Sequence, residues 1–218
     1  LKELNVSNNI SIKDLIAKKA AAELFDGAVV NLGIGLPELV ANYIPEDMEV
    51  ILQSENGILG MGAHVSEPAD EHNCFNAGGK CVALKKGSML FDSATSFMFI
   101  RGGHVDVAIL GALQVDQEGS LASHEIPGKF IPGMGGAMDL AAGAKKLIIA
   151  TSHTQKGRPK LFEKISFPAT AVKCVDTIIT ELCVIDVIDE RFVVREMFPD
   201  ISRDELQELT AAPLLFKD

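Results

Sequence analysis

The chain has 218 residues, 47% of them apolar, and its 20 basic and 30 acidic residues give a formal charge of −10. This acidic balance argues against a broad nucleic-acid-binding surface, which requires basic side chains. The high apolar content predicts that the chain buries surface against a partner as well as within itself.

Cysteine usage and hydropathy predict where the protein works. The cysteines form no C-x-x-C pair and are expected to be reduced thiols of a cytosolic protein: Cys74, Cys81, Cys174 and Cys183. No apolar run approaches the roughly 20 residues of a membrane span, and no signal peptide precedes the first expected helix. We therefore expect a cytoplasmic protein that does not contact membranes.

The chain is expected to begin with a polar, loose arm over residues 1–10, followed by a helix. Ser11 with Asp14 three residues later is typical of a helix-capping box. Apolar residues then recur at helical spacing, and Gly27 is the expected end of the helix; the apolar positions are Leu15, Ile16, Ala20 and Leu24.

Two apolar runs, 28-AVVNLGIGLP-37 and 49-EVILQS-54, predict buried strands on either side of a helix over 37–43 that starts at Pro37. Residues 60–80 mix Gly, Ala, Asn and charged residues, and we expect a long functional loop there. The run 81–93 predicts two short strands around Lys86-Gly87, and 94–101 a short helix.

The second half of the chain is strand-rich. The runs 105-VDVAILGALQV-115 and 146-KLIIAT-151 are apolar without alternation, as expected of strands covered on both faces. Residues 177–189 and 192–198 also read as strands. A closing helix is expected near Ser202, with Glu205 in the capping-box position.

Continuous apolar strands separated by helices predict an α/β fold with a mainly parallel sheet flanked by helices. We find no linker or repeat and treat residues 1–218 as one domain. Ligands of such sheets bind beyond the carboxyl ends of the strands. The glycine-rich turns at 33–37, 55–62 and 133–140 follow expected strands, or lie close to them, and can converge on one crevice.

The turn 33-GIGLP-37 carries two glycines ahead of a helix, a pattern that lets a ligand approach the backbone. It fails the dinucleotide pattern G-x-G-x-x-G, because residue 38 is Glu. On this motif alone, a tight strand-to-helix turn without a ligand is the favoured explanation. The turn 133-GMGGAMDL-140 predicts a nest of backbone donors suited to an oxyanion, a phosphate or a carboxylate, or else a loop whose glycines only reverse the chain.

Glu55 follows the strand 49–54 and precedes Asn56-Gly57. Most such residues are solvent-facing turn residues. The alternative is a nucleophilic carboxylate, which is ionised at neutral pH and needs no base to activate it. Ser54 does not meet the hydrolase pattern G-x-S-x-G, since Leu52 and Asn56 stand where the glycines belong.

No metal site is expected, because the histidines have no ligand spacing of a known type; they are His64, His72, His104, His124 and His153. A basic island, 156-KGRPK-160, stands out in this acidic chain. It is either a solvated loop or a place where Lys156 and Arg158 attract the phosphates of a ligand.

Taken together, 31-NLGIGLP-37, 53-QSENG-57, 101-RGGHVDVAILGALQV-115 and 132-PGMGGAMDLAAGAKK-146 resemble the B (beta) subunit of class I, two-subunit CoA-transferases. The likeness is greatest to acetate or butyrate:acetoacetate and succinyl-CoA:3-oxoacid CoA-transferases, and it runs from about residue 12 to about residue 213. The stretch QSENG is specific to this group, whereas GIGLP alone is not.

The resemblance implies a fold shared with ribose-5-phosphate isomerase and makes Glu55 the nucleophile. Glu55 would attack an acyl-CoA thioester to give a mixed anhydride, which the released CoA thiolate converts into a glutamyl-CoA thioester; a second carboxylate then reverses the steps. The acids expected are acetoacetate with acetate, butyrate or succinate. CoA is a substrate in this scheme, and no cofactor is required.

Roles for the glycines follow from that chemistry. We expect Gly135 and Gly136 to supply oxyanion donors, and Asn56 and Gly57 to shape the turn that aims Glu55. Gly33 and Gly35 would let CoA or the acyl group approach the backbone.

The resemblance also implies a partner, the A (alpha) subunit of the CoA-transferase, in an αβ or α2β2 assembly. Two other functions remain open from the residues alone: a sugar-phosphate isomerase or deaminase, and a non-catalytic ligand-sensing domain on the same fold.

Overall fold

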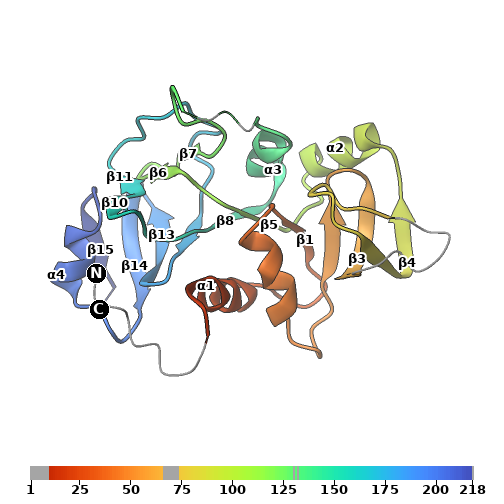
Figure 1. Cartoon of the computed structure of the whole chain (residues 1–218), viewed down its shortest axis with the longest axis horizontal. Helices are drawn as coiled ribbons and strands as arrows, with labels where there is room; N and C mark the ends of the chain where they lie inside the picture. The colour runs from red at the N-terminus through yellow and green to blue at the C-terminus, as the bar shows by residue number, and fades with distance from the viewer. Residues whose placement is uncertain (1–9, 66–73, 130, 132, 218) are drawn as a thin grey trace.

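The computed structural model describes residues 10–65, 74–129, 131 and 133–217, so most of the expected N-terminal arm lies outside the described residues. One large sheet of ten strands runs through the molecule (Figure 1). In sheet order the strands are β15 (Leu214–Phe216), β14 (Arg191–Met197), β13 (Cys183–Ile188), β12 (Thr177–Ile179), β8 (Lys146–Ala150), β5 (Val107–Leu110), β1 (Val29–Leu32), β2 (Ile51–Ser54), β3 (Ile58–His64) and β4 (Val82–Leu90).

The remaining elements cover this sheet or extend it. The helices are α1 (Ile12–Ala21), the 3-10 helix η1 (Pro37–Tyr43), α2 (Ser93–Arg101), α3 (Ala137–Gly143) and α4 (Arg203–Glu208). Two small sheets join β11 (Leu161–Phe162), β6 (Gln114–Asp116) and β7 (Leu121–Ala122), and β9 (Thr154–Gln155) with β10 (Arg158–Pro159). No helix of the described residues is long and apolar enough to cross a membrane.

The centre of the sheet is parallel, as predicted. Strands β2, β1, β5, β8 and β12 pair in parallel, and antiparallel strands follow on both sides. All four residues of β5 are buried because helices cover both faces. Val107 and Ile109 join the core beneath α1, whereas Ala108 and Leu110 join the core beneath α2 and α3. The α/β architecture predicted from the apolar runs is confirmed.

The predicted helix starts are confirmed, but one helix end is wrong. The Ser11 hydroxyl accepts the Asp14 N–H at 3.2 Å, and Ser202 with Glu205 forms a complete capping box. Helix α1 ends at Ala21, well before Gly27. Gly27 instead adopts φ +79° in the turn that leads into β1, where its N–H donates to Glu49 O.

Strand boundaries differ from the prediction in two ways. In one case a strand continues through a glycine where a break was predicted, and in the other a strand ends within an apolar run. Residues 82–90 form one strand and not two, because the pairing of β4 with β3 takes up Lys86-Gly87 as an irregularity, with Gly87 at φ +86°. The run 105–115 is divided at Gly111: β5 lies in the large sheet and β6 in a small one.

The run 177–189 is likewise two strands, β12 and β13, paired antiparallel. The expected loop over 60–80 is partly strand, since β3 continues to His64. Its last part, Cys74–Val82, is a hairpin closed by the Phe75–Cys81 bridge.

Candidate active site

Glu55 lies where β2 ends, in a turn of three residues before β3 begins. Gly57 closes this turn at φ +115°, and its N–H donates to Ser54 O at 2.9 Å. A Cβ atom at Gly57 would lie 1.9 Å from Phe91 O, so no other residue fits. The backbone that carries Glu55 is therefore fixed by packing against the segment after β4.

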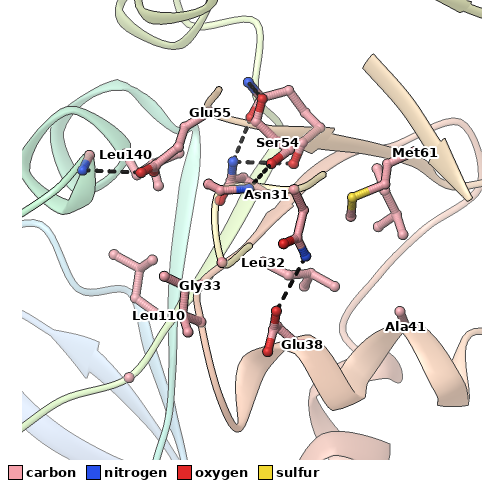
Figure 2. Close-up of a pocket in the computed structure, with 18 of the residues that line it drawn as sticks. Asn31, Leu32, Gly33, Glu38, Ala41, Ser54, Glu55, Met61, Leu110 and Leu140 are labelled. Atoms are coloured by element: carbon pink, nitrogen blue, oxygen red, sulfur yellow. Dashed lines mark hydrogen bonds between the residues drawn. The ribbon is translucent and has the colours of Figure 1, made fainter. Parts of the chain in front are cut away.

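The carboxylate of Glu55 points toward the start of α3 (Figure 2). The Gly136 N–H donates to Glu55 Oε1 at 3.4 Å, and a Cβ on Gly136 would lie 2.3 Å from Oε2. Gly135 is next to this contact, with φ +53°. The structure thus brings together two turns that are about 80 residues apart in the sequence, as predicted.

The environment of Glu55 raises the pKa of its carboxyl group. Partial burial raises the pKa of Glu55, the Gly136 N–H lowers it, and the charge of Asp139 raises it, with a net upward shift. A carboxylate with few hydrogen bonds and a raised pKa is more nucleophilic than a fully solvated one. Such a group is typical of a functional site.

Glu55 borders a cavity of about 880 Å³ at the carboxyl ends of β1, β2 and β5. Its apolar wall suits a short aliphatic group and includes Leu32, Leu52, Met61, Leu110 and Leu140. Polar lining residues include Asn31, Gln53, Lys85, His64 and His124. A cleft of this size at this edge of a parallel sheet is the expected place for a ligand.

A buried polar chain supports the floor of this cavity, and sequence reasoning missed it. The Asn31 amide donates to Gln53 Oε1 at 2.5 Å, and the Gln53 amide donates to Ser96 Oγ at 2.9 Å. These side chains couple β1, β2 and α2 directly behind the Glu55 turn. Their signal in the sequence was polarity inside apolar strands, at Asn31 and Gln53, where a buried polar group requires a partner.

The residues on either side of Glu55 bind the Cys74–Val82 hairpin. Ser54 Oγ accepts the Ala77 N–H at 3.0 Å, so this hydroxyl is engaged in structure. The Asn56 amide donates to Phe75 O at 2.6 Å, and Asn56 does not line the cavity. Asn56 and Gly57 therefore hold the turn by contacts to other segments.

The backbone amides of Gly33 and Gly35 are already engaged. The Gly33 N–H donates to Ile109 O at 2.8 Å, and a Cβ there would lie 3.1 Å from the Leu110 side chain. The Gly35 N–H donates to Glu38 Oε2 at 3.1 Å, at φ +92°. Gly33 lines the cavity, and its close packing against Ile109 and Leu110 accounts for the glycine. Gly35 does not line the cavity and has open space around it, so its positive φ accounts for the glycine.

The basic island lies apart from Glu55. Lys156 occupies the exposed turn of the β9–β10 hairpin with φ 52°, and Arg158 is also exposed. Neither lines the cavity of Glu55. Lys160 folds inward instead, where its ammonium donates to Thr151 Oγ1 at 2.7 Å and to Ala112 O at 3.1 Å.

His153 and two of the cysteines are at least partly buried, and none of them lines the cavity of Glu55. His153 is fully buried between two threonine hydroxyls, and burial lowers its pKa to about 4. The described cysteines are all free thiols, and burial raises the pKa of Cys174 to about 11 and that of Cys183 to about 12. Within the described residues, no group of three or more His, Cys, Asp or Glu side chains could hold a metal ion. His72 lies outside the described residues.

The chain matches a known family over most of its length. The family model described as coenzyme A transferase matches residues 14–209. The beta subunit of the acetate CoA-transferase of Haemophilus influenzae is 49% identical over 96% of this chain and 94% of its own length. The B subunit of the 3-oxoadipate CoA-transferase of Acinetobacter baylyi is 44% identical over 93% and 94%.

Among solved structures, an acyl-CoA transferase from Escherichia coli O157:H7 superposes with a TM-score of 0.75 at 21% identity. The match covers 95% of this chain and 42% of the solved one, so the present chain spans less than half of that protein. At this identity the superposition shows a common fold.

Proposed function

This chain belongs to the coenzyme A transferase family as a subunit of the beta type, and we propose that Glu55 is the residue on which CoA is transferred. The observation that carries the proposal is the contact of the Glu55 carboxylate with Gly136, at the edge of a largely apolar cavity. Relatives at 44–49% identity are named as subunits of an acetate CoA-transferase and a 3-oxoadipate CoA-transferase, which supports CoA transfer over the isomerase and ligand-sensor alternatives.

The first step places an acyl-CoA thioester carbonyl next to Glu55. A Glu55 oxygen attacks the carbonyl carbon, and the tetrahedral oxyanion takes hydrogen bonds from backbone N–H groups of the Gly135-Gly136 loop. Each such donor is commonly worth roughly 10²–10³ in rate. Collapse of the oxyanion breaks the carbon–sulfur bond and releases CoA thiolate, leaving an acyl-glutamyl anhydride.

The thiolate then attacks the Glu55 carbonyl of the anhydride, so that the donor acid leaves as a carboxylate and Glu55 carries CoA as a thioester. An acceptor carboxylate attacks this thioester and the two steps run in reverse. The thioester bond energy is retained throughout, and the apolar wall of the cavity limits hydrolysis of the intermediates by water. We propose short-chain acids as substrates: acetoacetate with acetate, butyrate or succinate.

We further propose that the alpha subunit covers this site, in an αβ or α2β2 enzyme. Seven large apolar side chains are exposed on the loop after β1, the Cys74–Val82 hairpin, β4, α2, the segment before α3 and α3 itself: Ile34, Phe75, Met89, Leu90, Met98, Ile131 and Met138. We call this set the apolar rim. Exposed apolar surface around a site is typical of a protein interface, and the relatives' names, as B or beta subunits, indicate a second chain.

Co-expression with the alpha subunit tests the two-subunit assembly and the proposed substrate class. The purified complex is assayed with acetoacetyl-CoA and a panel of acetate, butyrate and succinate. We expect CoA transfer to at least one acid by the complex and none by either polypeptide alone. Full turnover by the beta-type polypeptide alone would contradict the two-subunit proposal, and a complex that transfers CoA to none of these acids would contradict the substrate class.

We also propose that Lys156 and Arg158 contact the phosphates of CoA. Because both side chains are exposed and lie outside the cavity wall, they can contribute only through a ligand tail that reaches the β9–β10 hairpin. Replacement of both by Ala should then raise the KM for acyl-CoA more at low salt than at high salt, and an unchanged KM at both would exclude the contact.

A further inference from the structure

A carboxylate that the chemistry described above does not use is buried in the cavity wall. Glu38 lies in the first turn of η1, and only 7% of the residue is exposed. Glu38 Oε2 accepts hydrogen bonds from the Lys80 ammonium at 2.7 Å and from the Gly35 N–H at 3.1 Å. Oε1 accepts one from the Asn76 amide at 3.4 Å, which is the dashed line that reaches Glu38 in Figure 2. An ionised group this deeply buried requires such partners.

Two of these partners belong to the Cys74–Val82 hairpin. Its turn is closed by the Asn76 N–H to Lys80 O at 2.9 Å and by the Lys80 N–H to Asn76 Oδ1 at 2.9 Å. Gly78 packs directly on the carboxylate, since a Cβ at that position would lie 3.1 Å from Glu38 Oε1. Glu38 thus contacts one side of the hairpin at three of its residues.

The other side of the hairpin holds the residues that flank Glu55. The Ala77 N–H donates to Ser54 Oγ, and Phe75 O accepts the Asn56 amide. The hairpin is therefore the only segment among the described contacts that links Glu38 to both neighbours of Glu55 in the sequence. Two hydrogen bonds therefore connect the hairpin that contacts Glu38 with the Glu55 turn.

We propose that Glu38 is a positioning residue whose ion pair with Lys80 fixes the Cys74–Val82 hairpin against the Glu55 turn, and thereby sets the direction from which Glu55 attacks. The pair also neutralises a carboxylate in the wall of a cavity that admits anionic acids. This inference rests on the proposed role of Glu55 as nucleophile.

The charges of the pair predict an ordered set of effects on the assembled two-subunit enzyme. Glu38→Gln should lower kcat about tenfold with KM changed less than about twofold, since displacement of a reacting group by about 1 Å costs up to 10² in rate. Lys80→Met should lower kcat further, because it leaves the buried carboxylate without a counter-ion. Adding Glu38→Gln to Lys80→Met should restore kcat to the level of Glu38→Gln alone.

Two further variants separate positioning from a general effect. Lys80→Arg keeps the ion pair and should retain kcat within about twofold of the wild type. Lys173→Met removes a similarly exposed lysine from an ion pair with Glu190 elsewhere on the surface and should leave kcat unchanged. Strictly additive losses in the Glu38/Lys80 pair, or a kcat unchanged in Glu38→Gln, would overturn the proposal.

Amide hydrogen exchange gives a readout that does not depend on turnover. In Glu38→Gln, exchange should become at least about tenfold faster in residues 54–57 and in the Cys74–Val82 hairpin, with no change in β8. A hairpin that loosens while residues 54–57 keep their wild-type exchange would also overturn the proposal. If the wild-type complex transfers no CoA, the proposed function fails, and the exchange data still decide whether Glu38 positions the turn.

Discussion

Two titratable groups of this chain that are at least partly buried, Glu55 and His153, are held in opposite ways. His153 is fully buried, and both ring nitrogens lie within hydrogen-bond distance of threonine hydroxyls: Nδ1 is 3.1 Å from Thr180 and Nε2 is 2.8 Å from Thr210. Glu55 is half-buried at the edge of a cavity, and its only described hydrogen bond is the 3.4 Å contact from Gly136.

The difference separates a structural group from one that is free to react. Burial shifts the pKa of both side chains toward the neutral form, downward for His153 and upward for Glu55. Only Glu55 combines this shift with open space in front of it and few competing partners. A perturbed pKa alone therefore does not identify an active site, and the cavity makes the distinction.

The substitution Glu55→Gln has the largest expected effect and tests the contrast between Glu55 and His153 most strongly. The amide keeps the size of the side chain and removes the nucleophile, so kcat in the assembled enzyme should fall at least roughly 10³-fold. Stability should hold or rise, because a partly buried carboxylate is removed. Steady-state kinetics and thermal unfolding measure the two effects, and turnover within tenfold of the wild type would exclude Glu55 as nucleophile.

His153 should show the reverse pattern, with an effect on stability and none on kcat. Its folded-state pKa of about 4 lies below the ordinary 6.5, so between these values the unfolded chain binds a proton that the folded chain does not. The stability that neutral His153 contributes is present above pH 6.5 and is lost as the pH falls toward 4, a change of about 3 kcal/mol.

The difference between the wild type and His153→Gln isolates this contribution from that of the carboxylates. Denaturant unfolding at several pH values should show a shallower loss of stability in the variant over this window. Equal slopes for the two proteins would mean that His153 titrates normally in the folded state.

Gly136 and Gly143, at the two ends of α3, offer a matched pair of glycine-to-alanine changes. The new methyl group of Gly136→Ala would meet the Glu55 carboxylate at 2.3 Å, so kcat should fall roughly 10²-fold. In Gly143→Ala it would meet Ile100 O at 2.4 Å, which should cost about 1–3 kcal/mol of stability and leave kcat of the folded enzyme unchanged. Equal effects of the two changes on kcat would show that Gly136 serves only the packing of α3.

The smallest expected effect concerns pH. The reacting form of Glu55 is the carboxylate, and its raised pKa means that activity is lost on acidification at a higher pH than for an ordinary glutamate. Asp139→Asn removes a charge that raises this pKa, so the acidic limb of kcat/KM should move to lower pH. If the acidic limb of kcat/KM stays at the same pH or moves to higher pH, a group other than Glu55 controls the loss of activity on acidification.

Sequence reasoning predicted that the Glu55 turn and the glycine turn before α3 come together, because the signals for both turns are local. Each signal can be read within one short segment of the sequence: the apolar strand before Glu55, the Asn56-Gly57 turn, and the glycines before α3. The α/β topology then predicts that these segments converge. The strand end at Gly111 and the irregularity at Lys86-Gly87 were not predicted, because tertiary pairing decides whether an apolar run continues or a glycine turns the chain.

The support for the site could not be predicted from local pattern. Glu38 and Lys80 are 42 residues apart, and Asn31 and Gln53 are 22 apart; no spacing rule joins either pair. Glu38 was recognised only as a residue that spoils a dinucleotide motif. Its burial, and its contact with the hairpin that holds Glu55, became visible only once the strands were placed.

Trapping the covalent intermediate on Glu55 tests the central claim most directly. The assembled enzyme is incubated with acetoacetyl-CoA without acceptor acid, digested, and its peptides are weighed by mass spectrometry, with Glu55→Gln treated in parallel. We predict that the wild-type peptide containing Glu55 gains the mass of CoA as a thioester, that hydroxylamine removes it, and that the variant gains nothing. A wild-type enzyme that turns over while this peptide stays unmodified, or that carries CoA on another residue, would contradict the account.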